Sequence, residues 1–310
     1  MVQAVLEPRQ RALQLNWEKT INRNNILRMD GGIKMSKGMI LKLEPYLSQK
    51  IWGWEKWVLS CHEDGKSTIK EGIYKGKELS EILGCGNNFP ILNKIIKAED
   101  TLSVQVHPND DYAKRVENSN GKTECWYILE AKEGATLVSG IKKGLNKEKL
   151  RQIIKEGKLE EYLERIYIKS GDFIYIPAGT VHAIEAGVKL IEVQQNSNIT
   201  YRLHDWGRGR EVHIEKSLDV IDYEGKNKGG RIADFVKLET PYFKVEKVIV
   251  KSNYIDIVNE NFHSYTVISG EGVIEANKKQ MNLKEEETIY ISKGTEYNLK
   301  GNMRLLKSSL

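Results

Sequence analysis

Short apolar runs separated by glycine, proline and asparagine dominate the chain from Met39 onward. The runs I-W-G-W at 51–54 and W-V-L-S at 57–60 are typical of strands joined by turns. Further strands are predicted at 89–96, 102–107 and 122–129, where apolar and polar residues alternate or apolar residues cluster. The pattern therefore predicts a mainly β fold.

Helical periodicity is confined to short segments. Residues 75–83 place Leu79, Ile82 and Leu83 on one side, and the glycine that follows is a stop signal. A second short helix is predicted at 112–117. The charged segment 146–165 predicts two more short helices, broken around Gly157, that serve as a packing face and solvent surface.

Composition favours a globular protein without nucleic-acid or membrane partners. The formal net charge of +5 arises from 48 basic and 43 acidic residues, and the two signs are interleaved, which is typical of a solvated surface. No run of about 18 apolar residues could span a bilayer. The three cysteines are odd in number and lack C-x-x-C spacing, which argues against a disulfide framework and indicates a reducing cytoplasm.

Residues 1–38 differ from the rest of the chain. They are polar and basic and contain no apolar core of a secretory signal. We expect an N-terminal extension that is disordered or not native, with the natural start at Met35 or Met39, because codons for the preceding Gly31-Gly32 can read as a ribosome-binding sequence.

The predicted strand at 102–107 carries the first candidate ligands. Side chains two apart on a strand point to one face, so Gln105 and His107 project together, and Pro108 ends the strand. An imidazole and an amide oxygen side by side form half of a metal site. Alone, such a histidine is more often a hydrogen-bonded structural residue.

A spacing motif supplies the second half of the site. Gly171 to His182 reads G-x5-P-x-G-x2-H, which resembles the second motif of the cupin superfamily, whose turn residues place a histidine at the start of a strand inside a small β-barrel. Glu124 lies in the predicted strand 122–129 and shares a face with Lys122 and Trp126. Taken alone, Glu124 would be a surface carboxylate.

The motif is repeated near the C-terminus. Residues 286–297 repeat the core Y-I-x-x-G-T, and Tyr297 stands where the first copy has its histidine. We therefore expect two cupin-type jelly-roll barrels with short helices and a metal site in the first barrel only. The expected divisions are a catalytic domain at 39–225 and a degenerate second domain at 226–310, which begins with a linker rich in glycine and lysine.

The four candidate ligands are Gln105, His107, Glu124 and His182. Two imidazoles, a carboxylate and an amide oxygen suit Zn²⁺ with an open position, although Fe²⁺ or Mn²⁺ would also be held. We expect one Zn²⁺ per chain. Because zinc has no redox chemistry, its task would be to polarise a carbonyl or hydroxyl.

The motifs Q-V-H-P, G-K-T-E-C-W-Y, I-P-A-G-T-V-H-A-I and N-S-N-I-T-Y-R-L-H-D-W-G-R occur in this order. Together they resemble the type I mannose-6-phosphate isomerases of the short bacterial form. The resemblance implies a zinc-dependent aldose–ketose isomerase that interconverts mannose 6-phosphate and fructose 6-phosphate through an enediol. It assigns the four ligands above to the metal, Arg202 to the catalytic site, and Ser103 and Lys122 to the substrate pocket.

Several alternatives stay open at this stage. Lys122 could bind phosphate or transfer a proton, the general base is unidentified, and Arg202 could instead form an ion pair with Asp205. His204 and Asp205 suggest another ligand pair, but a structural role is favoured. The rival functions are an iron dioxygenase of the same superfamily and a non-catalytic sugar-binding protein. The expected partner is a phosphorylated hexose, and the chain is expected to be a monomer or a homodimer.

Overall fold

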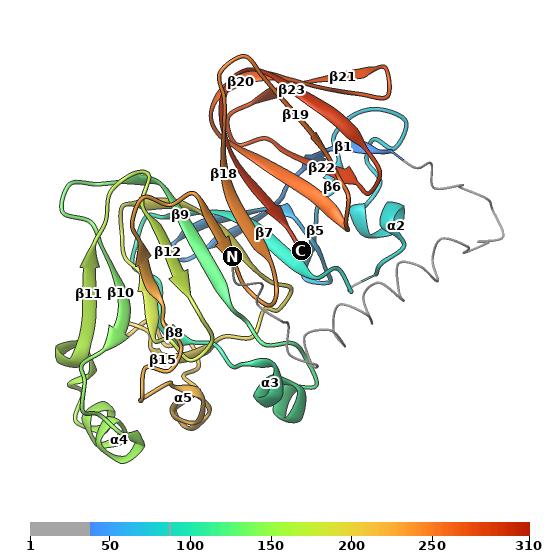
Figure 1. The fold of residues 1–310 in the computed structure, drawn as a ribbon. Coiled ribbons are helices and arrows are strands. Elements are labelled where there is room, and N and C mark those ends of the chain that lie inside the picture. Colours follow the sequence, from blue (N-terminus) through green and yellow to red (C-terminus); the bar gives the residue numbers. More distant parts are fainter. Residues whose placement is uncertain (1–37, 87) are drawn as a thin grey trace, which may run out of the picture.

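The computed structural model describes residues 38–86 and 88–310, and it arranges them as two β-barrels side by side (Figure 1). Residues 1–37 of the expected extension, including the candidate start Met35, lie outside the described residues. Gly38 and the other candidate start, Met39, are described. Strands far outnumber helices, so the predicted mainly β fold is confirmed.

The first barrel consists of two facing antiparallel sheets. The seven-stranded sheet has, in spatial order, β16 (Gly230–Ile232), β12 (Phe173–Ile176), β9 (Glu124–Ala131), β14 (Val188–Gln195), β7 (Ile91–Ala98), β3 (Gly53–Leu59) and β2 (Tyr46–Lys50). The five-stranded sheet has β11 (Leu163–Tyr167), β10 (Thr136–Ile141), β13 (His182–Ile184), β8 (Val104–Val106) and β15 (Tyr201–His204).

The second barrel is formed by a nine-stranded sheet that curls on itself. Its path is β17 (Lys237–Glu239), β18 (Lys244–Val250), β23 (Glu296–Ser309), β20 (Phe262–Ala276), β22 (Thr288–Ser292), β1 (Ile40–Glu44) and β6 (Thr68–Ile69), with β19 (Asn253–Ile257) on β23 and β21 (Lys279–Lys284) on β20. Each barrel includes a strand from the other end of the sequence. β1, near the N-terminus, pairs with β22 of the second barrel, and β16, from the C-terminal part, pairs with β12 of the first barrel. A small hairpin joins β4 (Cys61–His62) and β5 (Gly65–Lys66).

The helices are short and peripheral, and α3, α4 and α5 gather at one end of the first barrel (Figure 1). Their bounds are α2 (Leu79–Leu83), α3 (Asp110–Glu117), α4 (Lys147–Lys155) and α5 (Ile214–Val220), with a 3₁₀ turn η1 (Leu159–Tyr162). None of the helices in the described ranges combines the length and apolar character needed to cross a bilayer.

The structure corrects two helix predictions. The helix expected over 75–83 is limited to α2, which ends where Gly84 adopts a left-handed conformation (φ 60°). The second helix expected in 146–165 is only the turn η1, and residues from Leu163 enter β11, which pairs with β10. Sheet pairing outweighs the helical spacing of this charged segment.

An apolar layer joins the two barrels. Phe173 of the first barrel stacks on Phe235 with ring centroids 3.6 Å apart, and Phe89 packs against Phe262 of the second barrel at 4.9 Å. All four rings are almost fully buried. The first barrel is therefore supported from one side by the second, while its open interior holds the polar residues described next.

Candidate metal centre

Three candidate site residues lie in one row across the five-stranded sheet. His182, the first residue of β13, pairs with Gln105 of β8, and Gln105 pairs with Arg202 of β15. Directly paired residues place their side chains on the same face. The strands therefore bring together residues separated by about a hundred positions in the sequence, and all three side chains line the barrel interior.

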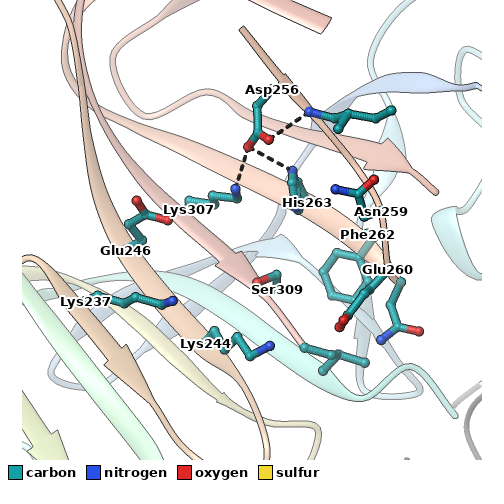
Figure 2. Close-up of a pocket in the computed structure, with 13 residues that line it drawn as sticks. Lys237, Lys244, Glu246, Asp256, Asn259, Glu260, Phe262, His263, Lys307 and Ser309 are labelled. Atoms are coloured by element: carbon teal, nitrogen blue, oxygen red, sulfur yellow. Dashed lines mark hydrogen bonds and ion pairs between the residues drawn. The ribbon is translucent and has the colours of Figure 1, made fainter. Parts of the chain in front are cut away.

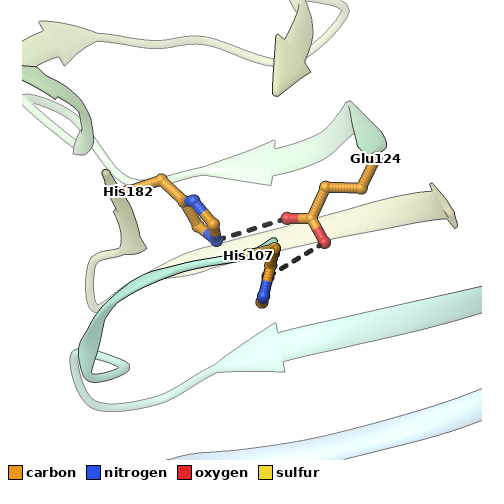
Figure 3. Close-up of side chains that lie close together, drawn as sticks. All are labelled: His107, Glu124 and His182. Carbon is orange, nitrogen blue, oxygen red and sulfur yellow. Dashed lines mark ion pairs between the residues drawn. The ribbon is translucent and has the colours of Figure 1, made fainter. Parts of the chain in front are cut away.

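Glu124, the first residue of β9, reaches the row from the opposite sheet. Its Oε2 lies 3.4 Å from Nε2 of His107, and its Oε1 lies 3.5 Å from Nε2 of His182. Figure 3 shows the carboxylate with one oxygen directed at each imidazole. His107 directly follows β8, and all three side chains are almost completely buried. Within the described ranges, these three residues form the group of His, Cys, Asp and Glu side chains that could hold a metal ion.

The donor chemistry of this cluster fits a divalent metal. Both oxygens of Glu124 are buried without a hydrogen-bond partner in the described residues. Lys122 compensates for the charge at Oε2, with Nζ 2.9 Å away, and a metal ion would compensate for the burial of Oε1. Nδ1 of His182 lies 2.9 Å from the carbonyl oxygen of Thr180, and this contact leaves Nε2 as the metal-facing nitrogen. Burial and the nearby Lys122 lower the pKa of His107 to about 3, so its imidazole is neutral and able to coordinate.

Gln105 and Lys122 complete the surroundings of the cluster. The side-chain amide of Gln105 lies 3.3 Å from Nε2 of His182, and rotation of the amide by 180° would present its oxygen to a metal. Nζ of Lys122 lies 2.9 Å from Oε2 of Glu124 and 3.0 Å from Nε2 of His107. Burial opposes ionisation of Glu124, but Lys122 and His107 outweigh it and hold its pKa well below the usual value.

A cavity of about 320 Å³ opens next to the cluster. Gln105, Lys122, Ser103 and Arg202 all line it, so the structure brings the sequence-predicted ligands and pocket residues together. The cavity is lined by five basic side chains and only two acidic ones. The basic residues are Lys50, Lys94, Lys122, Arg202 and Arg210, and the acidic residues are Glu55 and Glu192. The excess of positive charge suits an anionic ligand.

Sequence reasoning missed a second polar row that faces this cavity. Lys94 of β7 pairs directly with Glu192 of β14, and the row is flanked by Trp57 on one side and Trp126 on the other. Nζ of Lys94 lies 3.3 Å from Oε1 of Glu192, while Nε1 of Trp126 donates a 3.0 Å hydrogen bond to Oε2 of Glu192. A charged residue inside an otherwise buried apolar strand was the available signal, in both 91–96 and 188–193.

The remaining residues of the 194–208 motif have different surroundings: Arg202 lines the cavity, whereas Asp205 and Arg208 form an ion pair. Asp205 forms ion pairs with Arg208 and Arg210, at 3.3 and 2.5 Å. Arg202 forms no ion pair in the described part of the chain, and its Nε has no hydrogen-bond partner. His204 lies outside the cluster, 3.7 Å from Glu160. These contacts favour a structural role for Asp205 and leave Arg202 available to a ligand.

Two family models match the chain. Residues 39–136 match the model described as phosphomannose isomerase type I, catalytic domain. Residues 231–310 match the model described as mannose-6-phosphate isomerase, cupin domain. The first match contains Gln105, His107 and Glu124, and the second covers most of the C-terminal barrel.

Known mannose-6-phosphate isomerases are similar to this chain over most of its length, in sequence and in structure. Mannose-6-phosphate isomerase ManA of Bacillus subtilis (strain 168) is 34% identical over 311 residues, covering 87% of this chain and 98% of the relative. The crystal structure of the mannose 6-phosphate isomerase from Bacillus subtilis has a TM-score of 0.80 at 30% identity, covering 87% of this chain and 99% of that one. A zinc-bound mannose 6-phosphate isomerase structure shares the fold with a TM-score of 0.68 at 15% identity, covering 87% and 98%. The chain belongs to the mannose-6-phosphate isomerase family, whose members are isomerases.

Proposed function

We propose that this chain is a zinc-dependent aldose–ketose isomerase that interconverts mannose 6-phosphate and fructose 6-phosphate through an enediol. The observation that carries the proposal is the position of the buried cluster of His107, Glu124 and His182, which adjoins a cavity with an excess of positive charge. The name of the relative at 34% identity, mannose-6-phosphate isomerase ManA, supports mannose 6-phosphate as the substrate.

The proposed Zn²⁺ would be held by His107, Glu124 and His182, with Gln105 as the fourth ligand after rotation of its amide. When bound, it would act as a Lewis acid toward the substrate oxygens that gain negative charge in the enediol. The zinc-bound structure that shares the fold supports this choice of metal.

The cationic side chains would bind and orient the substrate. Lys122, two residues before β9, and Arg202, on β15 of the five-stranded sheet, both line the cavity. A phosphorylated sugar between them would meet two cations, one that attracts its phosphate and one that stabilises the charge that develops in the enediol. Arg202 is our candidate for stabilising the enediol, because its guanidinium is not engaged in an ion pair within the described residues.

The proton transfer requires a group that removes a proton beside the carbonyl and returns it to the neighbouring carbon. Glu192 is our candidate, because burial and the negative charge of Glu124 raise its pKa, which moves a carboxylate toward the range useful for a general base. Burial opposes protonation of Lys94, but Glu55 and Glu192 outweigh it and raise its pKa. Lys94 would therefore remain charged and stabilise the oxygens of the reacting sugar.

We also propose the domain division at 39–225 and 226–310 and a cytoplasmic location. The family matches begin at residues 39 and 231, which supports the division. The three cysteines are free thiols, which supports a reducing compartment.

A coupled assay for fructose 6-phosphate formation, with metal analysis of the same sample, tests the function. We expect turnover from mannose 6-phosphate that a chelator abolishes and added Zn²⁺ restores. His182→Ala should lose the metal and the activity while the far-ultraviolet circular dichroism stays unchanged. The matched control is His204→Ala, which alters a histidine outside the cluster and should retain both. Full activity of His182→Ala would rule out the proposed site.

A further inference from the structure

The second barrel contains a cavity of about 260 Å³ that shares no lining residue with the cavity beside the cluster of His107, Glu124 and His182. Figure 2 shows its lining, which comes from β17, β18, β19, β20 and β23 and from the loop after β19. This volume lies below the ~300 Å³ typical of the smallest drug-sized sites. The cavity therefore limits its occupant to roughly the size of a monosaccharide.

Two rows of paired residues form one wall. Lys237 of β17 pairs with Glu246 of β18, and Glu246 pairs with Lys307 of β23. Two residues along, Lys244 pairs with Ser309. Paired side chains on one face lie about 5 Å apart, so lysine and glutamate alternate along the wall. Lys237 already forms an ion pair with Glu239, which leaves Lys244 and Glu246 as the adjacent donor and acceptor for a ligand.

One carboxylate of the lining holds the neighbouring side chains in place. Oδ2 of Asp256 accepts hydrogen bonds from Nζ of Lys307 at 2.7 Å and from the hydroxyl of Tyr297 at 3.1 Å. The Tyr297 hydroxyl also lies 2.7 Å from Nδ1 of His263. Lys307 is only 9% exposed. Asp256 thus holds Lys307 and His263 in place, and such preorganisation lowers the entropic cost of binding a ligand.

The charge of this cavity distinguishes it from the one beside the metal cluster. Three lysines are balanced by three acidic residues; they are Lys237, Lys244 and Lys307 against Glu246, Asp256 and Glu260. Burial and the nearby Lys307 lower the pKa of His263 to about 4, so this residue adds no charge at neutral pH. A cavity without net charge does not concentrate anions.

We propose that the second barrel binds a small neutral polyhydroxylated ligand, of the size of an unphosphorylated monosaccharide, in this cavity. Each hydroxyl group can both donate and accept, so neighbouring hydroxyls match the alternation of lysine and glutamate along the wall. Asn259 and Asn261 lie on the loop that lines the opposite side, where their amides supply further donors and acceptors. The site is separate from the proposed isomerase pocket and does not depend on it.

The probe is D-mannose, titrated into the full-length chain by isothermal calorimetry and by saturation-transfer NMR. To exclude binding at the first barrel, the titration is repeated in an excess of mannose 6-phosphate, which would fill the proposed isomerase pocket, and mannose 6-phosphate is also titrated alone. We expect D-mannose binding that persists in this excess and weakens about tenfold or more in the double variant Lys244→Gln and Glu246→Gln, since each removes a charged hydrogen-bonding partner. The control is Lys247→Gln, on the same strand but outside the cavity, which should bind D-mannose as the parent does.

Three results would overturn the proposal. One is the absence of a D-mannose signal in the parent chain, and another is full retention of binding in the double variant. The third is a site at this cavity that accepts mannose 6-phosphate but not D-mannose, because that preference requires a net positive cavity. Isomerase turnover serves as a fold check and should be unchanged in the double variant.

Discussion

Lys94 and Glu192 are direct neighbours across two central strands of the first barrel, with Nζ of Lys94 3.3 Å from Oε1 of Glu192. Both side chains are almost fully buried, and both line the cavity beside the cluster of His107, Glu124 and His182. Burying two opposite charges contributes little to stability unless their geometry is ideal. The pair is therefore better explained by chemistry in the cavity than by the stability of the fold.

Glu192→Gln tests the assignment of the proton acceptor. The amide keeps the size of the side chain but cannot take up a proton, so we expect kcat to fall by about 10²- to 10⁴-fold with the zinc content unchanged. The matched control is Glu130→Gln on β9, whose carboxylate forms exposed ion pairs with Lys97 and Lys189, and it should leave kcat unaltered. A Glu192→Gln enzyme with kcat near that of the parent would move the role of base to another residue.

The sequence was sufficient to predict the positions of residues that depend on local spacing. Gln105 and His107 lie two positions apart on or next to a strand, and His182 follows turn residues that place it at a strand start. Such periodicity requires only the geometry of one strand. The mainly β fold was predictable for the same reason.

The meeting of Lys94 with Glu192 depends on register and was beyond sequence reasoning, although each charged residue stood out in its own strand. Lys94 and Glu192 are 98 positions apart, and nothing in either strand reveals that β7 and β14 pair so that these two meet. The wall of the second cavity likewise arises from pairings among β17, β18 and β23. Register is set by the packing of the whole sheet and not by the local pattern.

Arg202→Lys tests the proposed stabilisation of the enediol. Lysine keeps the positive charge but loses the planar, forked set of donors, so we expect kcat to fall about 10- to 100-fold, with zinc content and far-ultraviolet circular dichroism unchanged. Arg165→Lys is the control, because Arg165 lies in the same sheet but pairs with Glu185 away from the cavity. An effect confined to KM would indicate that Arg202 binds the substrate without stabilising the transition state.

Glu287 gives a prediction about pH and stability. Burial opposes its ionisation, but Lys42 at 2.7 Å and Lys70 at 3.2 Å outweigh it and lower its pKa. A lowered folded-state pKa stabilises the fold above the unfolded value of about 4.3, and this contribution is lost as the pH falls through the folded-state pKa. Glu287→Gln should therefore cost about 2 kcal/mol at pH 7, the value of a hydrogen bond to a charged group, and progressively less below pH 4.

Thermal unfolding of the parent and of Glu287→Gln, measured from pH 7 down to pH 3, checks this prediction. The difference in Tm between the two proteins should narrow as the pH falls. Glu285→Gln is the control, since Glu285 is exposed two positions away and its removal should shift Tm very little at any pH. A Tm difference that stays constant with pH would show that the lost stability comes from packing and not from the ion pairs of Glu287.

Gly121, which precedes Lys122 and Glu124, packs against the start of α3, and a larger residue does not fit there. A Cβ at Gly121 would lie 2.5 Å from the backbone of Asn109 and Asp110, which must shift because backbone atoms cannot rotate away. Gly121→Ala should therefore displace the start of β9, weaken zinc binding at least tenfold and lower Tm. Competition with a chromophoric chelator measures the affinity. The control is Asn120→Ala, which truncates an exposed neighbour and should change neither the zinc affinity nor Tm. Unaltered zinc affinity in Gly121→Ala would show that the position of β9 does not depend on this contact.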